Sequence, residues 1–350
     1  MEKKYDKPFK TYLEQLNILK EKYGLNLNFS VQELEIIKSI SYYDIVNGYK
    51  ECFMDKNDTY LKGTTLNFMF KFLQFDKNFQ NILFKYSVFA ENNFKTNLAY
   101  SISNNFGVEA DSFLKEDNFQ KFDADPERKY KLEKLLRNIK RTSLKTKDPP
   151  TNFYRENHNH IPPWVLFKNI KFNSSIDLYS ALKGTDKKEI YEEYLQNYNI
   201  SKNDKTDFLK NMLTIVRKFR NKIAHNGKFI TYNIENKYQL LPRCLEKIFV
   251  NAPLVFSKDD IKTSLGRRDI YGMILALTIL IKNKALVLSM LQEINFLFST
   301  ESKIINKYIN ITKLPDNFIF RINKLAFYVS EEQEKSKNKL IANVKQKDEL

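Results

Sequence analysis

The residues of this chain best suited to chemistry are Arg220, Asn221 and His225, in the stretch RNKIAH. A histidine near neutral pH can take a proton from a ribose hydroxyl or give one to a leaving oxygen. An arginine can hold the nonbridging oxygens of a phosphate and stabilise the charge that grows there, while an asparagine can orient the histidine ring or the substrate. These residue types fit a metal-independent cleavage of RNA. An ordinary amphipathic helix end is the alternative, because basic residues favour helix C-termini.

The three residues end the best-defined helix that the sequence predicts, over residues 204–225. Its apolar residues recur at helical spacing and form one buried stripe: Phe208, Met212, Ile215, Val216, Phe219 and Ile223. Asp204 or Thr206 is expected to cap its start, and Asn226 with Gly227 to end it in the left-handed conformation. His225 is therefore expected in the last turn.

The helix geometry separates the arginine from the other two residues. At about 100° per residue, Asn221 and His225 share a face with Arg217, whereas Arg220 points about 140° away from His225. Arg220 borders the apolar stripe, where a partly desolvated charge needs a partner. We therefore expect its side chain to wrap around the helix or to meet another group.

Only one copy of the pattern occurs in the chain. Arg137 and Asn138 begin a similar stretch, but Thr142 stands where the histidine would be. One histidine hardly serves as both base and acid, so the chemistry favours a homodimer in which two copies share a cleft.

A strongly basic stretch lies between residues 128 and 147, where the only acidic residue is Glu133. Such a stripe can bind the phosphates of RNA, and a solvated helix face is the alternative. Its candidate RNA-binding residues, with Arg217 from the site helix, are Arg128, Lys129, Lys131, Lys134, Arg137, Lys140, Arg141, Lys145 and Lys147.

Composition and charge narrow the class of protein. Lys+Arg 58 against Asp+Glu 42 gives a net charge of +16, which favours a nucleic-acid partner over an anionic membrane face. No apolar run reaches the roughly 18 residues of a membrane span, and the start MEKKYDKPFK is unlike a signal peptide. We expect a cytoplasmic protein that binds RNA and no membrane. The terminal KDEL, residues 347–350, is interpreted as a coincidence because it functions only with a secretion signal.

Metal and other cofactors are not expected. The two cysteines, Cys52 and Cys244, supply neither a disulfide framework nor a closed zinc site. His158 and His160 could suggest metal ligands, but no cysteine or carboxylate cluster stands at matching spacing, which favours a polar loop.

The pattern of the whole chain predicts an all-α fold, because apolar residues recur every three or four positions and glycine and proline are rare. We expect an N-terminal helical segment (1–60), a helical core (61–232) with a basic excursion at about 123–163, a C-terminal helical region (233–330) and a polar tail (331–350). The predicted helices are 9–22, 31–40, 62–73, 77–103, 109–115, 126–144, 163–171, 175–182, 187–197, 204–225, 238–250, 268–298 with a break, 302–309 and 316–329.

Several segments together resemble a known family. They are KPFKTYLEQLNILKEKYGL near the start, SISYYDIVNGYKECF at 39–53, HIPPWVLFKNIKF at 160–172 and RKFRNKIAHNGKFI at 217–230. Their order resembles the Abi-like abortive-infection family, AbiD/AbiF group, of the HEPN superfamily, over roughly residues 7–232. The pattern departs from the family at Asp44, where arginine is frequent, and at 171–173, which read KFN instead of SFG.

The resemblance implies a HEPN-type helical bundle, here with a basic helical insertion and a C-terminal extension. It also implies homodimerisation, bacterial antiphage defence and ribonuclease activity, in some relatives with a small noncoding RNA. The family places an acidic and a basic residue on the helix before the site, which Glu91 and Lys95 match, and Glu91 could pair with Arg220.

Three functions are therefore open. The first is a homodimeric endoribonuclease, and the second is a noncatalytic RNA-binding dimer that holds a small noncoding RNA. The third is a basic helical scaffold for protein partners.

Overall fold

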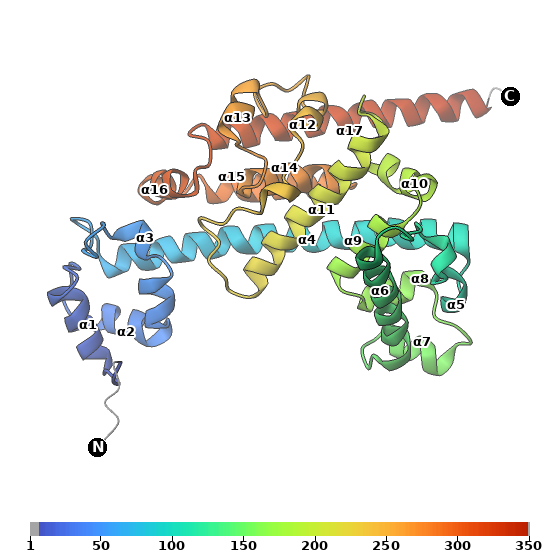
Figure 1. The fold of residues 1–350 in the computed structure, drawn as a ribbon. Helices are drawn as coiled ribbons and strands as arrows, with labels where there is room; N and C mark the ends of the chain where they lie inside the picture. Colours follow the sequence, from blue (N-terminus) through green and yellow to red (C-terminus); the bar gives the residue numbers. More distant parts are fainter. Residues whose placement is uncertain (1–6, 349–350) are drawn as a thin grey trace, which may run out of the picture. The chain divides into compact units, whose positions relative to one another are not determined.

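The computed structural model describes the backbone of residues 7–348 and the side chains of residues 7–334. All the secondary-structure elements within residues 7–348 are helices, which confirms the prediction of an all-α fold (Figure 1). Contacts divide the chain into two compact units, Met1–Asn81 with Leu297–Lys313, and Ile82–Phe296 with Leu314–Leu350. The four segments expected from the sequence were drawn at sequence landmarks, so this division by contacts does not test them, and they remain a prediction.

The first unit is built around aromatic side chains. Its elements are α1 (Tyr12–Glu21), α2 (Val31–Ser39), the π-helix η1 (Tyr43–Asn47), α3 (Lys50–Phe53), the first part of α4 (Leu66–Phe106) and α16 (Ser302–Thr312). Phe53, Phe72 and Tyr308 are fully buried there, with edge-on and tilted ring contacts. These rings pack together with buried aliphatic side chains to form the core of the unit.

Helix α4 corrects the sequence prediction of two helices over 62–73 and 77–103. The chain continues without interruption from Leu66 to Phe106. Asp76 lies where we expected the break, and it is buried at 1% exposure. Its carboxylate accepts hydrogen bonds from Tyr49 Oη (2.6 Å), Gln80 Nε2 (2.6 Å) and Tyr308 Oη (2.7 Å). Because these partners satisfy the carboxylate, the helix can carry a buried polar residue without ending.

The second unit contains the rest of α4 and the helices that surround the candidate site. These are α5 (Ala110–Phe113), η2 (Glu116–Asn118), α6 (Pro126–Lys145), α7 (Thr151–Asn157), α8 (Pro163–Asn169), α9 (Phe172–Ala181), α10 (Gly184–Leu195), α11 (Lys202–Ala224), η3 (Asn236–Tyr238), α12 (Pro242–Ile248), α13 (Lys258–Thr263), α14 (Ile270–Leu280), α15 (Lys284–Leu297) and α17 (Phe318–Asp348).

Helix α11 occupies the centre of this unit and packs against α9, α10 and α14 (Figure 1). The whole of α14 is buried, so it offers an apolar surface to the stripe on α11. Five residues of the predicted stripe are fully buried, and Ile223 is partly exposed. The predicted N-cap is wrong, because the Ser201 side chain, and not that of Asp204 or Thr206, accepts the capping hydrogen bond. Packing against α14 therefore fixes the orientation of α11, whose last turn contains the candidate site.

Some helices were not predicted. Helix α7 lies within a proline-rich stretch that reads as a loop, and η1, α3 and α13 are too short to show a periodic pattern. The predicted break within 268–298 is confirmed, because α14 and α15 are separate helices. Helix α17 extends the predicted 316–329 to Asp348, so most of the polar tail is helical backbone. Glu349 and Leu350 of the KDEL stretch lie outside the described residues.

Candidate functional site

The last turn of α11 ends in a tight hydrogen-bonded turn at His225. The backbone N–H of Gly227 donates to the carbonyl of Lys222 (2.8 Å), and that of Asn226 donates to the carbonyl of Ile223 (3.0 Å). Asn226 has φ +50°, as expected of the left-handed residue that closes such a turn, whereas Gly227 does not have the left-handed φ that we predicted. Gly227 instead lets the chain pass close to Lys222, because a Cβ at this position would lie 2.8 Å from Lys222 Cδ.

The turn exposes the histidine. His225 is the C-cap residue, its side chain is exposed, and its backbone N–H donates to the carbonyl of Asn221 (3.1 Å). Asn221 lies one turn earlier and is partly buried. The imidazole is therefore accessible to a substrate, and the amide stands next to it on the same face of the helix.

Arg220 lies between the helix and its neighbour α4. Its side chain is 32% exposed, its Cζ lies 5.5 Å from the centre of the Phe84 ring, and its Nη2 lies 3.8 Å from Glu91 Oε2. Its Nη1 donates a hydrogen bond to Asn221 Oδ1 (3.2 Å). The guanidinium thus wraps back toward the face that carries Asn221 and His225, although its Cα points away from them.

The arginine retains bonding capacity. Its Nε is buried and has no hydrogen-bond partner among the described residues. A buried donor without an acceptor is costly, and such groups are found where a ligand or another molecule completes the site. The Arg220 side chain is also partly exposed, so an anion can reach the guanidinium at the end of the helix that carries the exposed imidazole.

A buried ion pair stands behind the arginine. Glu91 and Lys95, one turn apart on α4, are 12% and 7% exposed, and Lys95 Nζ lies 2.7 Å from Glu91 Oε1. Lys95 also donates to the carbonyl oxygen of Ile170 (2.8 Å), which ties α4 to the turn between α8 and α9. The pair combines a carboxylate that orients Arg220 with a cation that balances it.

The neighbouring basic residues of α11 differ in their partners. Arg217 is partly buried, and its Nε has no hydrogen-bond partner within the described chain. Lys218 is paired with Glu235 (2.7 Å), and Lys222 lies over the ring of Tyr232. Arg217 therefore keeps one buried donor that no residue of the described chain satisfies.

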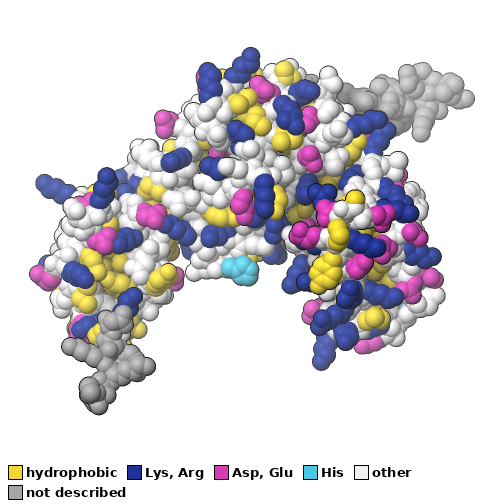
Figure 2. Space-filling view, in the orientation of Figure 1, with side chains coloured by type: hydrophobic (Ala, Val, Ile, Leu, Met, Phe, Trp, Pro, Cys, Tyr) yellow, Lys and Arg dark blue, Asp and Glu magenta, His cyan; other side chains and the backbone are white. Residues whose placement is uncertain are grey.

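The basic stretch of residues 128–147 forms α6 and the start of the following loop, and Lys and Arg side chains gather over this helix (Figure 2). Its apolar side is buried through Leu132, Leu136 and Ile139. Three of its predicted RNA-binding residues are engaged in ion pairs, Arg128 with Asp125, Lys131 with Glu127 and Lys140 with Asp111. For Lys129, Lys134, Arg137, Arg141, Lys145 and Lys147, no carboxylate partner occurs in the described part of the chain.

The other two histidines follow α7, with His158 at its C-cap and His160 in the loop after it. His158 stacks on Tyr154 with ring centres 4.4 Å apart, and His160 Nδ1 lies 2.7 Å from Asn159 Oδ1. No group of three potential metal-ligating side chains comes together within the residues that the structure describes. Likewise, no described helix is both long and apolar enough to cross a membrane.

Sequence reasoning missed the residues that join α6 to α9. Lys171 and Ser174 at the start of α9 lie beside Arg141, Thr142 and Lys145 of α6 around one pocket. The only sequence signal was the basic residue Lys171 at a helix start, a position where acidic residues are usual.

The fold and the site define an all-helical protein in which one basic helix ends in an exposed histidine beside an amide and a shielded arginine. The chain belongs to the Abi-like protein family, whose model matches residues 35–231, more than half of its 350 residues. This confirms the Abi-like family that the sequence segments resemble, and three of the four segments, 39–53, 160–172 and 217–230, lie within the matched range. The matched range contains Glu91, the basic stretch and RNKIAH. No curated protein and no solved structure matches the chain.

Proposed function

We propose that this protein is an antiphage abortive-infection protein of the HEPN superfamily, a cytoplasmic homodimer that cleaves RNA without a metal ion. The observation that carries the proposal is the hydrogen bond from Arg220 Nη1 to Asn221 Oδ1 (3.2 Å), one turn before the exposed His225. Membership of the Abi-like family supports the role in abortive infection.

Each residue has a distinct role in the proposed reaction. The ribose 2′-oxygen attacks the adjacent phosphorus, and the bond from phosphorus to the 5′-oxygen breaks. Arg220 stabilises the charge on the nonbridging oxygens, and Asn221 holds the guanidinium toward the histidine face. His225 moves one of the two protons, and His225 of the partner subunit moves the other. The products carry a 2′,3′-cyclic phosphate and a 5′-hydroxyl.

Substitution of the histidine tests the proposal. We expect His225→Ala to lower the cleavage rate by at least about a hundredfold, because general acid–base catalysis typically contributes that much. His158→Ala is the matched control, since it removes another exposed histidine of the same unit. The rate in EDTA should equal the rate without it. A fully active His225→Ala variant, or loss of activity in EDTA, would show that the mechanism is wrong.

A second function is favoured by the cations of α6 that have no carboxylate partner. Here the protein is a noncatalytic dimer that binds a small noncoding RNA through α6, Arg217 and Arg220. Sequencing of RNA that copurifies with the protein separates the two functions. A single intact species that His225→Ala protein also retains, with no turnover of added RNA, supports the binding function, whereas turnover of added RNA supports the nuclease.

A further inference from the structure

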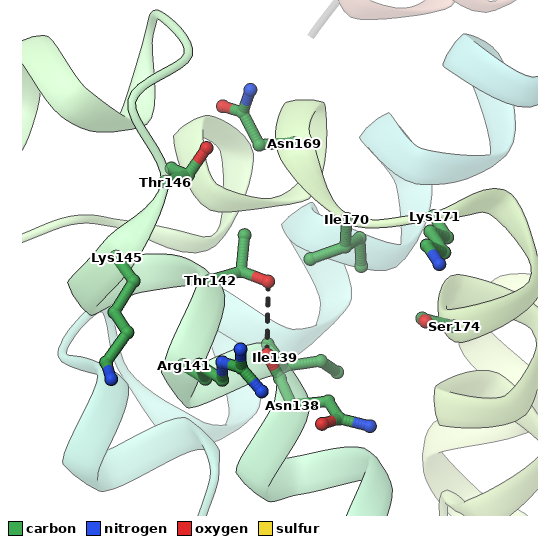
Figure 3. A pocket seen from close by; sticks show the side chains of 10 residues that line it. All are labelled: Asn138, Ile139, Arg141, Thr142, Lys145, Thr146, Asn169, Ile170, Lys171 and Ser174. Carbon is green, nitrogen blue, oxygen red and sulfur yellow. Dashed lines mark hydrogen bonds between the residues drawn. The ribbon is translucent and has the colours of Figure 1, made fainter.

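A pocket of about 440 Å³ opens in the second unit between the C-terminal half of α6 and the first turn of α9 (Figure 3). Arg141 and Lys145 line it from α6, and Lys171 lines it from the start of α9. Ile139 and Ile170, both buried, provide its apolar wall. A pocket that combines an apolar wall with a few polar groups is typical of a small-ligand site.

The lining of this pocket is positive and contains no carboxylate. In the part of the chain that the structure describes, none of Arg141, Lys145 and Lys171 has an ion-pair partner. Other cations of α6 do, such as Lys131 with Glu127. An unbalanced group of three cations in a concave site attracts an anion more strongly than the same charges on an open surface.

The two helix ends at this pocket have opposite dipoles, and only the N-terminal end, that of α9, favours an anion. Helix α9 begins after Lys171 with no side-chain cap, so the N–H groups of its first turn keep their partial positive charge near the lining residues Lys171 and Ser174. At the other wall, Arg155 donates hydrogen bonds to the carbonyl oxygens of Ser143 (3.0 Å) and Thr146 (2.8 Å). Arg155 thereby offsets the negative end of α6, which would otherwise repel an anion.

The pocket walls are held in place without a ligand. Asn169 Oδ1 accepts from the Thr151 hydroxyl (2.6 Å), and its Nδ2 donates to the carbonyl of Pro149 (3.2 Å). Lys95 fixes the carbonyl of Ile170 from behind. These bonds are satisfied within the protein, which leaves Asn138 of α6 as the lining amide whose side chain is exposed toward a ligand.

We propose that this pocket binds the terminal phosphate of a nucleotide. A phosphomonoester carries a charge of about −1.5 to −2 at neutral pH, more than the single charge of a phosphodiester, and so suits three cations better. The volume leaves room for the attached nucleoside against Ile139 and Ile170. A free nucleotide and the 5′ end of an RNA strand share this chemistry. The proposal does not depend on RNA cleavage, because it concerns binding alone.

Calorimetric titration of the full chain tests it with two pairs of probes. AMP is compared with adenosine, and a 5′-phosphorylated hexanucleotide with its 5′-hydroxyl form, both with 2′-O-methyl groups that prevent cleavage. The pocket variant is Arg141→Gln/Lys145→Gln, and Lys171→Gln removes the cation from the opposite wall. The control is Lys188→Gln/Lys202→Gln, which removes two exposed cations of the same unit that lie outside both α6 and the pocket.

In at least one pair we expect the phosphorylated probe to bind at least about tenfold more tightly, because hydrogen bonds to charged groups each contribute that much. The pocket variant and Lys171→Gln should lose this preference, while the control keeps it. A preference confined to AMP identifies a free nucleotide as the ligand, and one confined to the oligonucleotide identifies a strand end. Equal binding within both pairs, or equal losses in pocket and control variants, would overturn the proposal.

Discussion

The buried pair of Glu91 and Lys95 makes the sharpest prediction about stability. Glu91→Gln keeps the shape of the side chain but leaves the Lys95 ammonium, 7% exposed, without a countercharge. Stranding one charge of a buried pair typically costs about 3–5 kcal/mol. Lys95 keeps its hydrogen bond to the Ile170 carbonyl, so we expect the free energy of unfolding to fall by an amount near the lower end of this range, about 3 kcal/mol.

Urea unfolding followed by the fluorescence of Trp164 measures this loss. Trp164 is the only tryptophan of the chain and belongs to the same compact unit as the pair, so its signal reports on that unit. Glu127→Gln is the control, because Glu127 and Lys131 form a pair of the same order and spacing that is exposed to solvent. It should leave the unfolding midpoint unchanged.

The double variant Glu91→Gln/Lys95→Met completes the test. Without the ammonium, the loss of the carboxylate has little cost, so the double variant should be more stable than Glu91→Gln alone. We expect a coupling free energy of about 2 kcal/mol between the two positions. Additive effects, or a loss below about 1 kcal/mol in Glu91→Gln, would refute the assignment of a buried, coupled pair.

Three further perturbations follow from the structure. Burial, reinforced by Lys210, lowers the pKa of Lys187 to about 8, so the unfolded chain binds this proton more strongly than the folded protein does. Lys187→Met should therefore stabilise the protein by about 1–2 kcal/mol at pH 7. This gain should disappear above pH 10.5, where the lysine is neutral in both states, and thermal melting at a series of pH values measures it. Asn226→Ala should destabilise the end of α11 by about 1 kcal/mol because of its left-handed φ, and Asn226→Gly should not, as thermal unfolding would reveal. Burial raises the pKa of the Cys244 thiol to about 12, so a thiol reagent at pH 8 should label it only after unfolding, and rapid labelling of the folded protein would contradict its burial.

The helices with strong apolar periodicity could be predicted from the sequence. The ends of α6 and α11 fall within two residues of the predicted positions, because proline at the start of one and the Asn226 turn after the other are local signals. The continuity of α4 could not be predicted. Asp76 reads as a polar break until Tyr49 and Tyr308, distant in sequence, are known to bind it.

The candidate site was predictable in its residue types but not in its environment. Helical geometry places Asn221 and His225 on one face, as the structure does. The bend of Arg220 toward Asn221 depends on Phe84 and Glu91, which belong to another helix. The pocket at Lys171 depends on the packing of α9 beside α6, for which no short sequence pattern exists.

The long contact between Arg220 and Glu91 bears on how the site could change partners. At 3.8 Å, against 2.7 Å for Lys95, the arginine is the weaker of the two cations that share the carboxylate. If Arg220 swings away to an incoming phosphate, Glu91 is still neutralised, so the departure strands no buried charge. Lys95 thus remains as the countercharge of Glu91, and the Arg220 side chain can move to a ligand without a cost to the stability of the fold.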